Sequence, residues 1–296
     1  MSKVGVIGAG KWGEALAFAM SEKNEVIITS RTPRDWSNFR SLGEVLACEY
    51  LIITVPAQQI AQWLKENFVY SGQKILVAAK GIEASSGRFL NEIYGEYVPS
   101  ENIAFLSGPS FASEVMRSLP TALVVNSVSS ETAGAIANLF PSFIRTYTSS
   151  DVIGAEITGA YKNVIAIAAG ICEGLDLGHN AAASLIARGL VEMERFGRAY
   201  GGTQESFLGL SGAGDLFLTA SSSMSRNYRV GLGLAIGKTK EAVCEEIGEV
   251  SEGIGTAYAL HEIALARSIY LPIAAEVYAI LEGKSPRQSL KDLIER

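Results

Sequence analysis

Residues 3–13 read KVGVIGAGKWG: a short apolar run, a glycine-rich turn and the start of an amphipathic stretch. The apolar run predicts a buried β-strand at Lys3–Ile7. The glycines Gly8, Gly10 and Gly13 then form the spacing Gly-x-Gly-x-x-Gly between a strand and a helix, which is typical of a dinucleotide-binding turn. A helix beginning near Trp12 would present free N–H groups to the diphosphate. An ordinary strand–turn–helix is the alternative, and the surrounding pattern favours the dinucleotide.

The first half of the chain alternates strand and helix patterns. The expected strands are Lys3–Ile7, Glu25–Ser30, Glu49–Val55, Lys74–Ala79, Ile103–Leu106, Thr121–Asn126 and Arg145–Thr148. The expected helices are Trp12–Ser21, Asp35–Ala47, Ala57–Asn67, Gly87–Tyr94 and Glu131–Phe140. Such alternation indicates βαβ units on a mainly parallel sheet, so we predict an α/β fold of the Rossmann-type, doubly wound kind for residues 1–150.

The strand signal ends after Ser150. From Asp151 the chain has helical spacing, with breaks expected at Gly201-Gly202, Ser221–Ser225 and Gly253–Gly255. We therefore predict an all-α domain over residues 151–296 that binds the substrate. Ligand sites favour the interface between two such domains.

Composition narrows the function classes. With 296 residues and 48% apolar content, the chain can build a sizeable core. A net charge of -6 gives no general attraction to nucleic acid or anionic membrane, so a phosphate site must be a local basic pocket. Cys48, Cys172 and Cys244 have neither disulfide nor metal-site spacing, which points to a reducing cytoplasm and no metal. We expect a cytoplasmic protein with no signal peptide and no stable membrane insertion, because the longest apolar run, Val164–Cys172, is short.

Arg31 indicates which dinucleotide binds. The second strand ends in Ser30-Arg31-Thr32, where an acidic residue would bind the ribose 2′-hydroxyl of NAD. An arginine there accommodates a 2′-phosphate, so we expect NADP or NAD, with NADP accepted at least as well. The alternative is that Arg31 is a surface cation and that Asp35 reaches the ribose.

Further strand ends and helix starts carry polar residues that could bind a ligand. Lys80 follows the fourth strand, and Ser107–Ala112 follows the fifth, although a solvated lysine and an ordinary turn would explain them too. Asp215 and Thr219 share one helical face, although Asp215 could be a helix N-cap. Arg226 offers a bidentate fork for phosphate, with Ser225 as an alternative helix cap.

Lys162 is the strongest candidate for a catalytic group. It lies in the apolar run after Thr158-Gly159-Ala160-Tyr161 and beside Asn163, where a lysine rarely occurs without a partner or a role. Burial or a nearby cation such as Lys80 would lower its pKa and suit it to acid–base catalysis. A structural ion pair is the alternative. His179 and His261 are the only histidines, so a histidine-based mechanism is disfavoured.

These motifs together resemble the bacterial NAD(P)-dependent glycerol-3-phosphate dehydrogenase family over nearly the whole chain. The most specific segments are Gly8–Gly13, Leu106–Ala112, Tyr161–Gly170, Gly214–Leu216, Ser225–Asn227 and Glu252–Gly253. The resemblance implies interconversion of dihydroxyacetone phosphate and sn-glycerol 3-phosphate, with supply of glycerol 3-phosphate for phospholipid synthesis. It implies a small phosphorylated three-carbon substrate and no nucleic-acid partner, and we also consider a homodimer.

The resemblance also assigns roles to single residues. Lys162 looks like the proton donor and acceptor, and the other catalytic candidates are Lys80, Asn163, Asp215 and Thr219. The candidates for substrate binding are Lys80, Gly108, Ser110, Lys162, Asp215, Ser225, Arg226 and Asn227. The candidates for cofactor binding are Gly8, Gly10, Lys11, Trp12, Gly13, Arg31, Lys80, Ala112, Arg226 and Glu252.

One segment departs from the family pattern. Most relatives carry a longer stretch between Arg31 and Glu49, so cofactor contacts from that loop are in doubt. Two other functions stay open: a ketopantoate reductase or β-hydroxyacid dehydrogenase on the same architecture, and a non-enzymatic NADP-binding protein. Arg226 argues against a carboxylate substrate, and Lys162 would be unnecessary in a protein that only binds NADP.

Overall fold

A seven-stranded sheet forms the N-terminal half of the protein in the computed structural model, which describes residues 1–249 and 251–295. The strands are β1 (Lys3–Ile7), β2 (Glu25–Thr29), β3 (Tyr50–Ile53), β4 (Lys74–Val77), β5 (Ile103–Ser107), β6 (Thr121–Asn126) and β7 (Ile144–Ser149). Their order is β2-β1-β3-β4-β5-β6-β7. The first five are parallel, while β6 runs antiparallel to β5 and parallel to β7. The predicted α/β fold with a mainly parallel sheet is confirmed.

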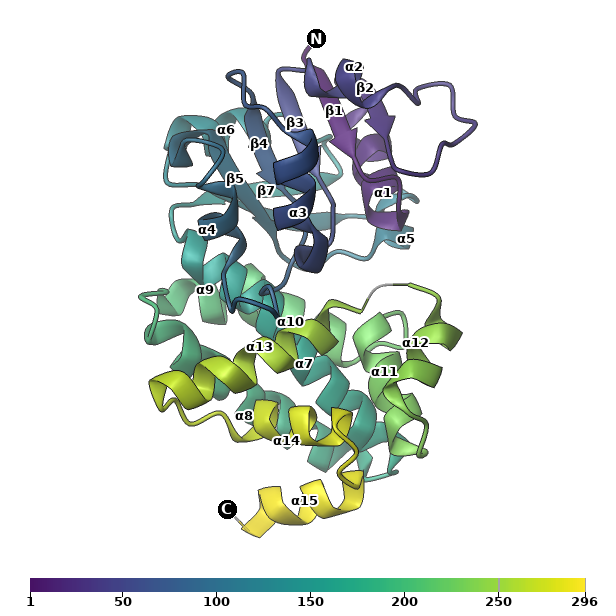
Figure 1. The fold of residues 1–296 in the computed structure, drawn as a ribbon, viewed down its shortest axis with the longest axis vertical. Helices are drawn as coiled ribbons and strands as arrows, with labels where there is room; N and C mark the ends of the chain where they lie inside the picture. Colours follow the sequence, from purple (N-terminus) through teal and green to yellow (C-terminus); the bar gives the residue numbers. More distant parts are fainter. Residues whose placement is uncertain (250, 296) are drawn as a thin grey trace.

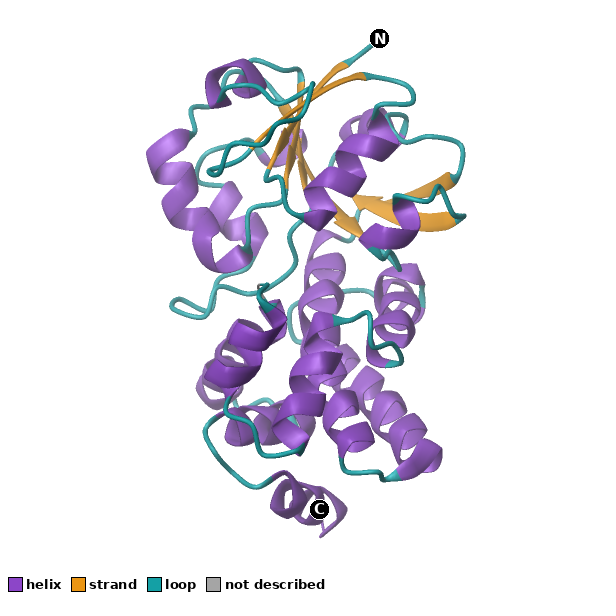
Figure 2. Ribbon diagram, turned by 90° about the vertical axis from the view of Figure 1, so that its right-hand side faces the viewer, coloured by secondary structure: helices purple, strands orange, loops and turns teal. Residues whose placement is uncertain are grey.

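Helices cover both faces of this sheet, as Figure 2 shows. The helices of this half are α1 (Lys11–Met20), α2 (Leu42–Leu46), α3 (Ala57–Asn67), α4 (Leu90–Tyr94), α5 (Ala112–Val115) and α6 (Ser130–Ala137), with the 3₁₀ turn η1 (Ser100–Asn102). One apolar cluster joins α1, α5 and α6 to the sheet, and a second joins α2, α3 and α4 to it. The parallel strands therefore have almost wholly apolar side chains, as expected for strands buried on both faces.

The C-terminal half is helical and lies below the sheet in Figure 1. It comprises α7 (Val152–Gly174), α8 (Gly178–Arg198), α9 (Gln204–Leu208), the π-helical turn η2 (Leu210–Gly214), α10 (Asp215–Ala220), α11 (Arg226–Ala235), α12 (Lys240–Ile247), α13 (Glu252–Arg267), α14 (Pro272–Leu281) and α15 (Pro286–Glu295). Asp151 caps α7 by accepting the Gly154 N–H at 2.9 Å. Helix α7 is buried along nearly its full length because α8, α10, α11, α13 and α14 pack around it.

Two sequence predictions about local structure are wrong. The helix expected at Asp35–Ala47 shortens to α2, because Phe39 pairs with Ile28 beside β2 and the Ser41 capping box starts the helix only at Leu42. The break expected at Gly253–Gly255 lies inside α13. Gly253 is needed there for close packing, since a Cβ would lie 2.7 Å from the Asn227 Oδ1 atom.

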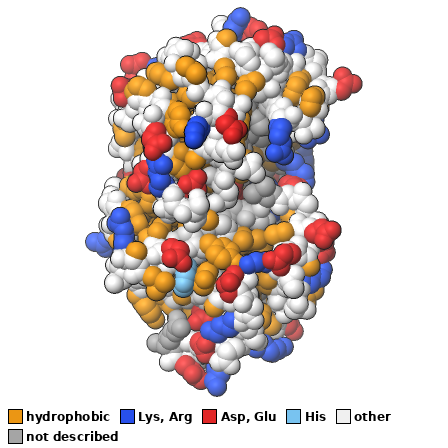
Figure 3. Space-filling model, viewed as in Figure 1, with side chains coloured by type: hydrophobic (Ala, Val, Ile, Leu, Met, Phe, Trp, Pro, Cys, Tyr) orange, Lys and Arg blue, Asp and Glu red, His pale blue; other side chains and the backbone are white. Residues whose placement is uncertain are grey.

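The longest helix is a core element. By length and composition alone, α7 could cross a membrane, although the short apolar run Val164–Cys172 did not suggest this. However, 89% of its most apolar 18-residue stretch is buried inside the protein. Acidic and basic side chains are interspersed on the face shown in Figure 3.

Candidate active site

The glycine-rich turn has the geometry that its sequence predicts. Gly8 has a φ of 111° and its N–H donates to the Thr29 carbonyl at 2.8 Å, so the chain turns sharply after β1. A Cβ on Gly13 would lie 1.8 Å from the Gly8 carbonyl oxygen, which excludes any other residue. Gly10 is the N-cap of α1 and offers no side chain to its N–H groups. A helix start of this kind favours an anion such as a diphosphate.

The edge of the turn is basic where β2 ends. Arg31 lines the cleft together with Arg34 and Arg40, whereas Asp35 does not line it. Of the two residues considered for the end of β2, Arg31 is therefore the one that faces the cleft.

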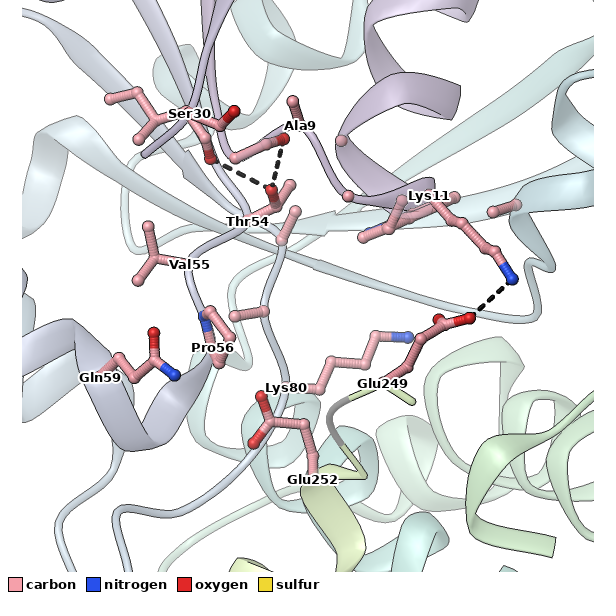
Figure 4. Close-up of a pocket in the computed structure, with 18 of the residues that line it drawn as sticks. Ala9, Lys11, Ser30, Thr54, Val55, Pro56, Gln59, Lys80, Glu249 and Glu252 are labelled. Carbon is pink, nitrogen blue, oxygen red and sulfur yellow. Dashed lines mark hydrogen bonds and ion pairs between the residues drawn. The ribbon is translucent and has the colours of Figure 1, made fainter. Parts of the chain in front are cut away.

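A cleft of about 1740 Å³ runs between the carboxyl ends of the parallel strands and the helical half. Figure 4 shows part of its lining, with side chains from the glycine turn, the segment that follows β3 and the start of α13. Ligands bind at this edge in doubly wound sheets, and the cleft meets the β1–β3 switch point. The size and place of the cleft suit a dinucleotide and a small second ligand.

Lys162, Lys80 and Asp215 form a charged cluster within this cleft. Asp215 lies at the start of α10 and accepts from Lys162 through Oδ1 at 2.5 Å and from Lys80 through Oδ2 at 2.7 Å. Lys162 also donates to the Thr219 hydroxyl at 3.0 Å. Asp215 thus binds side chains rather than capping a helix, and the two ammonium groups leave the cluster with a net positive charge.

Burial controls the protonation of the cluster. Loss of hydration lowers the pKa of Lys162 to about 8, with repulsion from Lys80 in the same direction and attraction from Asp215 opposing both. Burial pushes the pKa of Asp215 upward, but attraction by the two lysines outweighs it and holds that pKa below its usual value. Asp215 is therefore ionised at neutral pH, while Lys162 exchanges a proton near neutrality.

Ser225, Arg226 and Asn227 lie at the start of α11 and line the same cleft. The Ser225 hydroxyl caps the helix by accepting the Tyr228 N–H, and the Asn227 Oδ1 atom accepts the Gly253 N–H at 3.0 Å. The capped helix start that was the alternative is therefore present, and Ser225 also lines the cleft. Arg226 lines the cleft, with a guanidinium nitrogen 3.5 Å from the Glu249 Oε2 atom.

The remaining predicted residues differ in position. Lys11, Trp12, Ser110, Ala112, Asn163 and Glu252 line the cleft. Gly108 does not line it; its φ of 105° and its tight packing on β6 explain the glycine without a ligand. The Glu252 Oε1 atom accepts the Ala57 N–H at 3.2 Å, and burial raises the Glu252 pKa to about 7.

Comparison with known proteins identifies the family. The model of the NAD-dependent glycerol-3-phosphate dehydrogenase C-terminus matches residues 151–292, and that of the N-terminus matches residues 38–133. The chain belongs to the NAD-dependent glycerol-3-phosphate dehydrogenase family. It is 70% identical over 294 residues to glycerol-3-phosphate dehydrogenase (NAD(P)+) of Sulfurimonas denitrificans, covering 99% of each chain. It is 53% identical to the protein of the same name from Campylobacter jejuni, again over 99% of each chain.

A solved structure extends the family match to the fold. Glycerol-3-phosphate dehydrogenase from Coxiella burnetii superimposes with a TM-score of 0.90 at 32% identity, covering 100% of this chain and 99% of that one. The N-terminal family match begins at residue 38, so the glycine turn and Arg31 lie outside it.

Sequence reasoning missed two residues that line the cleft, Thr54 and Glu249. The Thr54 hydroxyl donates to the Ile7 and Gly8 carbonyls, each at 3.1 Å, and fixes the turn, as Figure 4 shows. Thr54 follows β3 at the same sheet edge, so the rule applied to Lys80 could have found it. Glu249, which pairs with Lys11 and Arg226, carries no signal in the local sequence. Within residues 1–249 and 251–295, no group of three or more His, Cys, Asp or Glu side chains is placed to hold a metal.

Proposed function

We propose that the protein interconverts dihydroxyacetone phosphate and sn-glycerol 3-phosphate with NADP or NAD as hydride carrier. The observation that carries the proposal is the cluster in which Asp215 pairs with both Lys80 and Lys162 inside the cleft of a member of this family. Full-length relatives that carry this activity in their names support it. So does a local excess of positive charge facing an anionic substrate.

The cleft fits a dinucleotide through its backbone. Any side chain at Gly13 would fill the space beside Gly8, and the N–H groups of α1 point to where a diphosphate would lie. The bound cofactor supplies or accepts a hydride. We propose that Gly8, Gly10, Lys11, Trp12 and Gly13 hold its diphosphate side, with Arg31 at the ribose. Lys80, Ala112, Arg226 and Glu252 complete the proposed contacts.

We infer that Lys162 carries the proton of the reaction. In reduction, the Lys162 ammonium gives a proton to the oxygen on the substrate carbon that is reduced; in oxidation, the neutral amine takes it back. Asp215 and Thr219 hold the Lys162 Nζ atom in place, and Lys80 stabilises negative charge that develops on the oxygen. Thr219 and Asn163 line the cleft around this point.

Arg226 is the proposed phosphate anchor. Its guanidinium offers a planar fork, and the start of α11 adds backbone N–H groups that favour an anion. Ser110, Ser225 and Asn227 line the cleft as further candidate contacts. Holding the phosphate, which does not react, would orient the ketone for the groups that do.

A substrate screen tests the activity. NADPH oxidation is followed with dihydroxyacetone phosphate, ketopantoate and an acetoacetyl thioester, and only the first should be turned over rapidly. Lys162→Ala should lower turnover by ~10²–10⁴-fold, the usual loss for a positioned acid. Lys65→Ala, an exposed lysine of α3 outside the cleft lining, is the control and should keep full activity. Rapid turnover of ketopantoate alone, or turnover retained without Lys162, would contradict the proposal.

We further propose that residues 1–150 and 151–296 act as dinucleotide and substrate domains. The end of β7 at Ser149 and the start of α7 at Val152 support that division. We also propose a cytoplasmic enzyme that supplies glycerol 3-phosphate for phospholipid synthesis. Fractionation of cells and loss of phospholipid labelling in a strain depleted of the enzyme test this role. The homodimer stays a prediction, which sedimentation analysis checks.

A further inference from the structure

Glu249 lies between cations from opposite halves of the molecule. Its Oε1 atom is 2.6 Å from the ammonium of Lys11, the first residue of α1. Its Oε2 atom is 3.5 Å from a guanidinium nitrogen of Arg226, the first residue of α11. Figure 4 shows the Lys11 contact reaching from the glycine turn to the helical half. One carboxylate therefore joins the two proposed anion-binding points of the cleft.

The chain presents Glu249 to the cleft through a specific turn. Gly248 ends α12 with a φ of 65°, a left-handed conformation that suits glycine. Glu249 follows directly, before α13 begins at Glu252, and lines the cleft with Lys11 and Arg226. Its hydrogen bond with Lys11 and the charges of Lys11, Arg226 and Arg229 hold the pKa of Glu249 below its usual value. The side chain is thus an anion at neutral pH.

These ion pairs are exposed enough to be displaced. The side chains of Lys11, Arg226 and Glu249 are 75%, 42% and 30% exposed. Solvent-exposed pairs contribute little and are screened by salt, unlike the buried pairs of Asp215. A diphosphate at the start of α1 or a phosphate at the start of α11 would bring stronger negative charge to the same cations.

We propose that Glu249 is an intramolecular anion that links the two halves across the cleft and competes with anionic ligand groups for Lys11 and Arg226. This inference rests on the proposed function, which places a diphosphate beside Lys11 and a phosphate beside Arg226. Glu249 then lowers the affinity for cofactor and substrate, and each ligand releases it on binding.

Glu249→Gln isolates the charge, because the amide keeps the shape and an oxygen that can accept from Lys11. NADPH is titrated by fluorescence into the wild type and the variant at about 0.05 M and about 0.5 M potassium chloride, which differ strongly in screening. We expect about two- to fivefold tighter NADPH binding at low salt, the range that an exposed ion pair contributes. The difference should shrink at high salt, and the KM for dihydroxyacetone phosphate should also fall at low salt.

Glu246→Gln is the matched control. Glu246 lies on α12, forms an ion pair with Lys238 and does not line the cleft. Its replacement therefore changes the net charge by the same amount as Glu249→Gln and also removes an ion pair with a lysine. We expect no change in NADPH affinity. Equal tightening in both variants would show a general charge effect and overturn the proposal, as would unchanged or weaker binding in Glu249→Gln. The melting temperature of each variant checks that it is folded.

The same measurements separate this inference from the proposed function. A wild-type protein that binds NADPH but does not reduce dihydroxyacetone phosphate refutes the proposed function, while the NADPH titration still decides the role of Glu249. Reduction of dihydroxyacetone phosphate with equal NADPH affinity in wild type and Glu249→Gln refutes the competition alone. A wild-type protein that binds neither NADPH nor NADH refutes both.

Discussion

Replacing Asp215 with asparagine should move the pH range in which the enzyme works. Reduction needs the Lys162 ammonium, so its rate should be full below the pKa of about 8 and fall as the pH rises through that value. Oxidation needs the neutral amine and should rise over the same range. Asp215 stabilises the ammonium, so its loss lowers the Lys162 pKa and moves both midpoints to lower pH.

The size of the shift follows from the geometry. Two opposite unit charges about 4 Å apart attract by about 4 kcal/mol at an effective dielectric constant of about 20, which sets the scale for Lys162 and Asp215, whose Nζ and Oδ1 atoms are 2.5 Å apart. At 1.36 kcal/mol per pKa unit this corresponds to about three units, an upper value because water and side-chain movement replace part of the lost attraction. Opposite charges at this range move pKa values by about one to three units. We therefore expect the midpoint to fall from about 8 to between about 5 and about 7.

The assay is the pH profile of kcat/KM for dihydroxyacetone phosphate and for glycerol 3-phosphate at saturating cofactor. The equilibrium constant fixes the ratio of kcat/KM for reduction to kcat/KM for oxidation at any one pH. The midpoint of each pH profile is therefore the quantity to compare between variants. Thr219→Val is the control: it removes a neutral hydrogen bond to Lys162 and leaves the charges in place. The substrate phosphate, which titrates near pH ~6, affects both variants equally. If the midpoint of Asp215→Asn lies within about half a pH unit of the wild-type midpoint, Asp215 does not control the group that carries the proton.

Three further predictions concern cofactor choice, substrate binding and stability. Arg31→Asp should raise the KM for NADPH far more than the KM for NADH, and equal changes would show that Arg31 does not bind the 2′-phosphate. Arg226→Lys should weaken use of dihydroxyacetone phosphate by ~1.5–3 kcal/mol in kcat/KM, since an ammonium cannot replace the fork; an unchanged value would remove Arg226 from the site. Burial raises the Glu156 pKa from 4.5 to about 8. The contribution of the neutral carboxyl to the free energy of unfolding is therefore fully present below about pH 4.5 and is lost as the pH rises through about 8. In denaturant unfolding, the free energy of unfolding of Glu156→Gln relative to wild type should therefore rise by up to about 1.4 kcal/mol per pH unit between pH 5 and 8. A difference between the two proteins that does not change with pH would contradict this.

The sequence predicts those parts of the fold that local patterns determine. The bounds of β1, β6 and α3 agree with prediction to the residue, because apolar runs and helical spacing mark them without tertiary help. The segment before α2 was mispredicted because Phe39 pairs with Ile28 in β2, a contact that helical spacing does not encode. The reversed direction of β6 and β7 likewise follows from how the chain returns to the sheet, not from strand composition.

The residues of the candidate site also fall into those that a local motif predicts and those that depend on distant contacts. The glycine turn could be predicted with its detailed geometry because one motif carries it. The pairing of Lys80 with Asp215 joins residues 135 positions apart, and only the resemblance to a family grouped them beforehand. Glu249 was not predicted, because an acidic residue near a helix start is common and its partners lie in α1 and α11.

The arrangement of Asp215 favours catalysis over a purely structural role. Burying one carboxylate with two ammonium groups is costly, and apolar side chains of similar volume would often stabilise a core as well or better. Lys80 comes from the loop after β4 and Lys162 from α7, so the cluster forms only when the two halves meet. One carboxylate leaves a net positive charge in a cleft that also contains a dinucleotide-type turn and Arg226. A structural ion pair requires neither that excess charge nor that location, whereas stabilising an oxyanion beside a hydride carrier requires both.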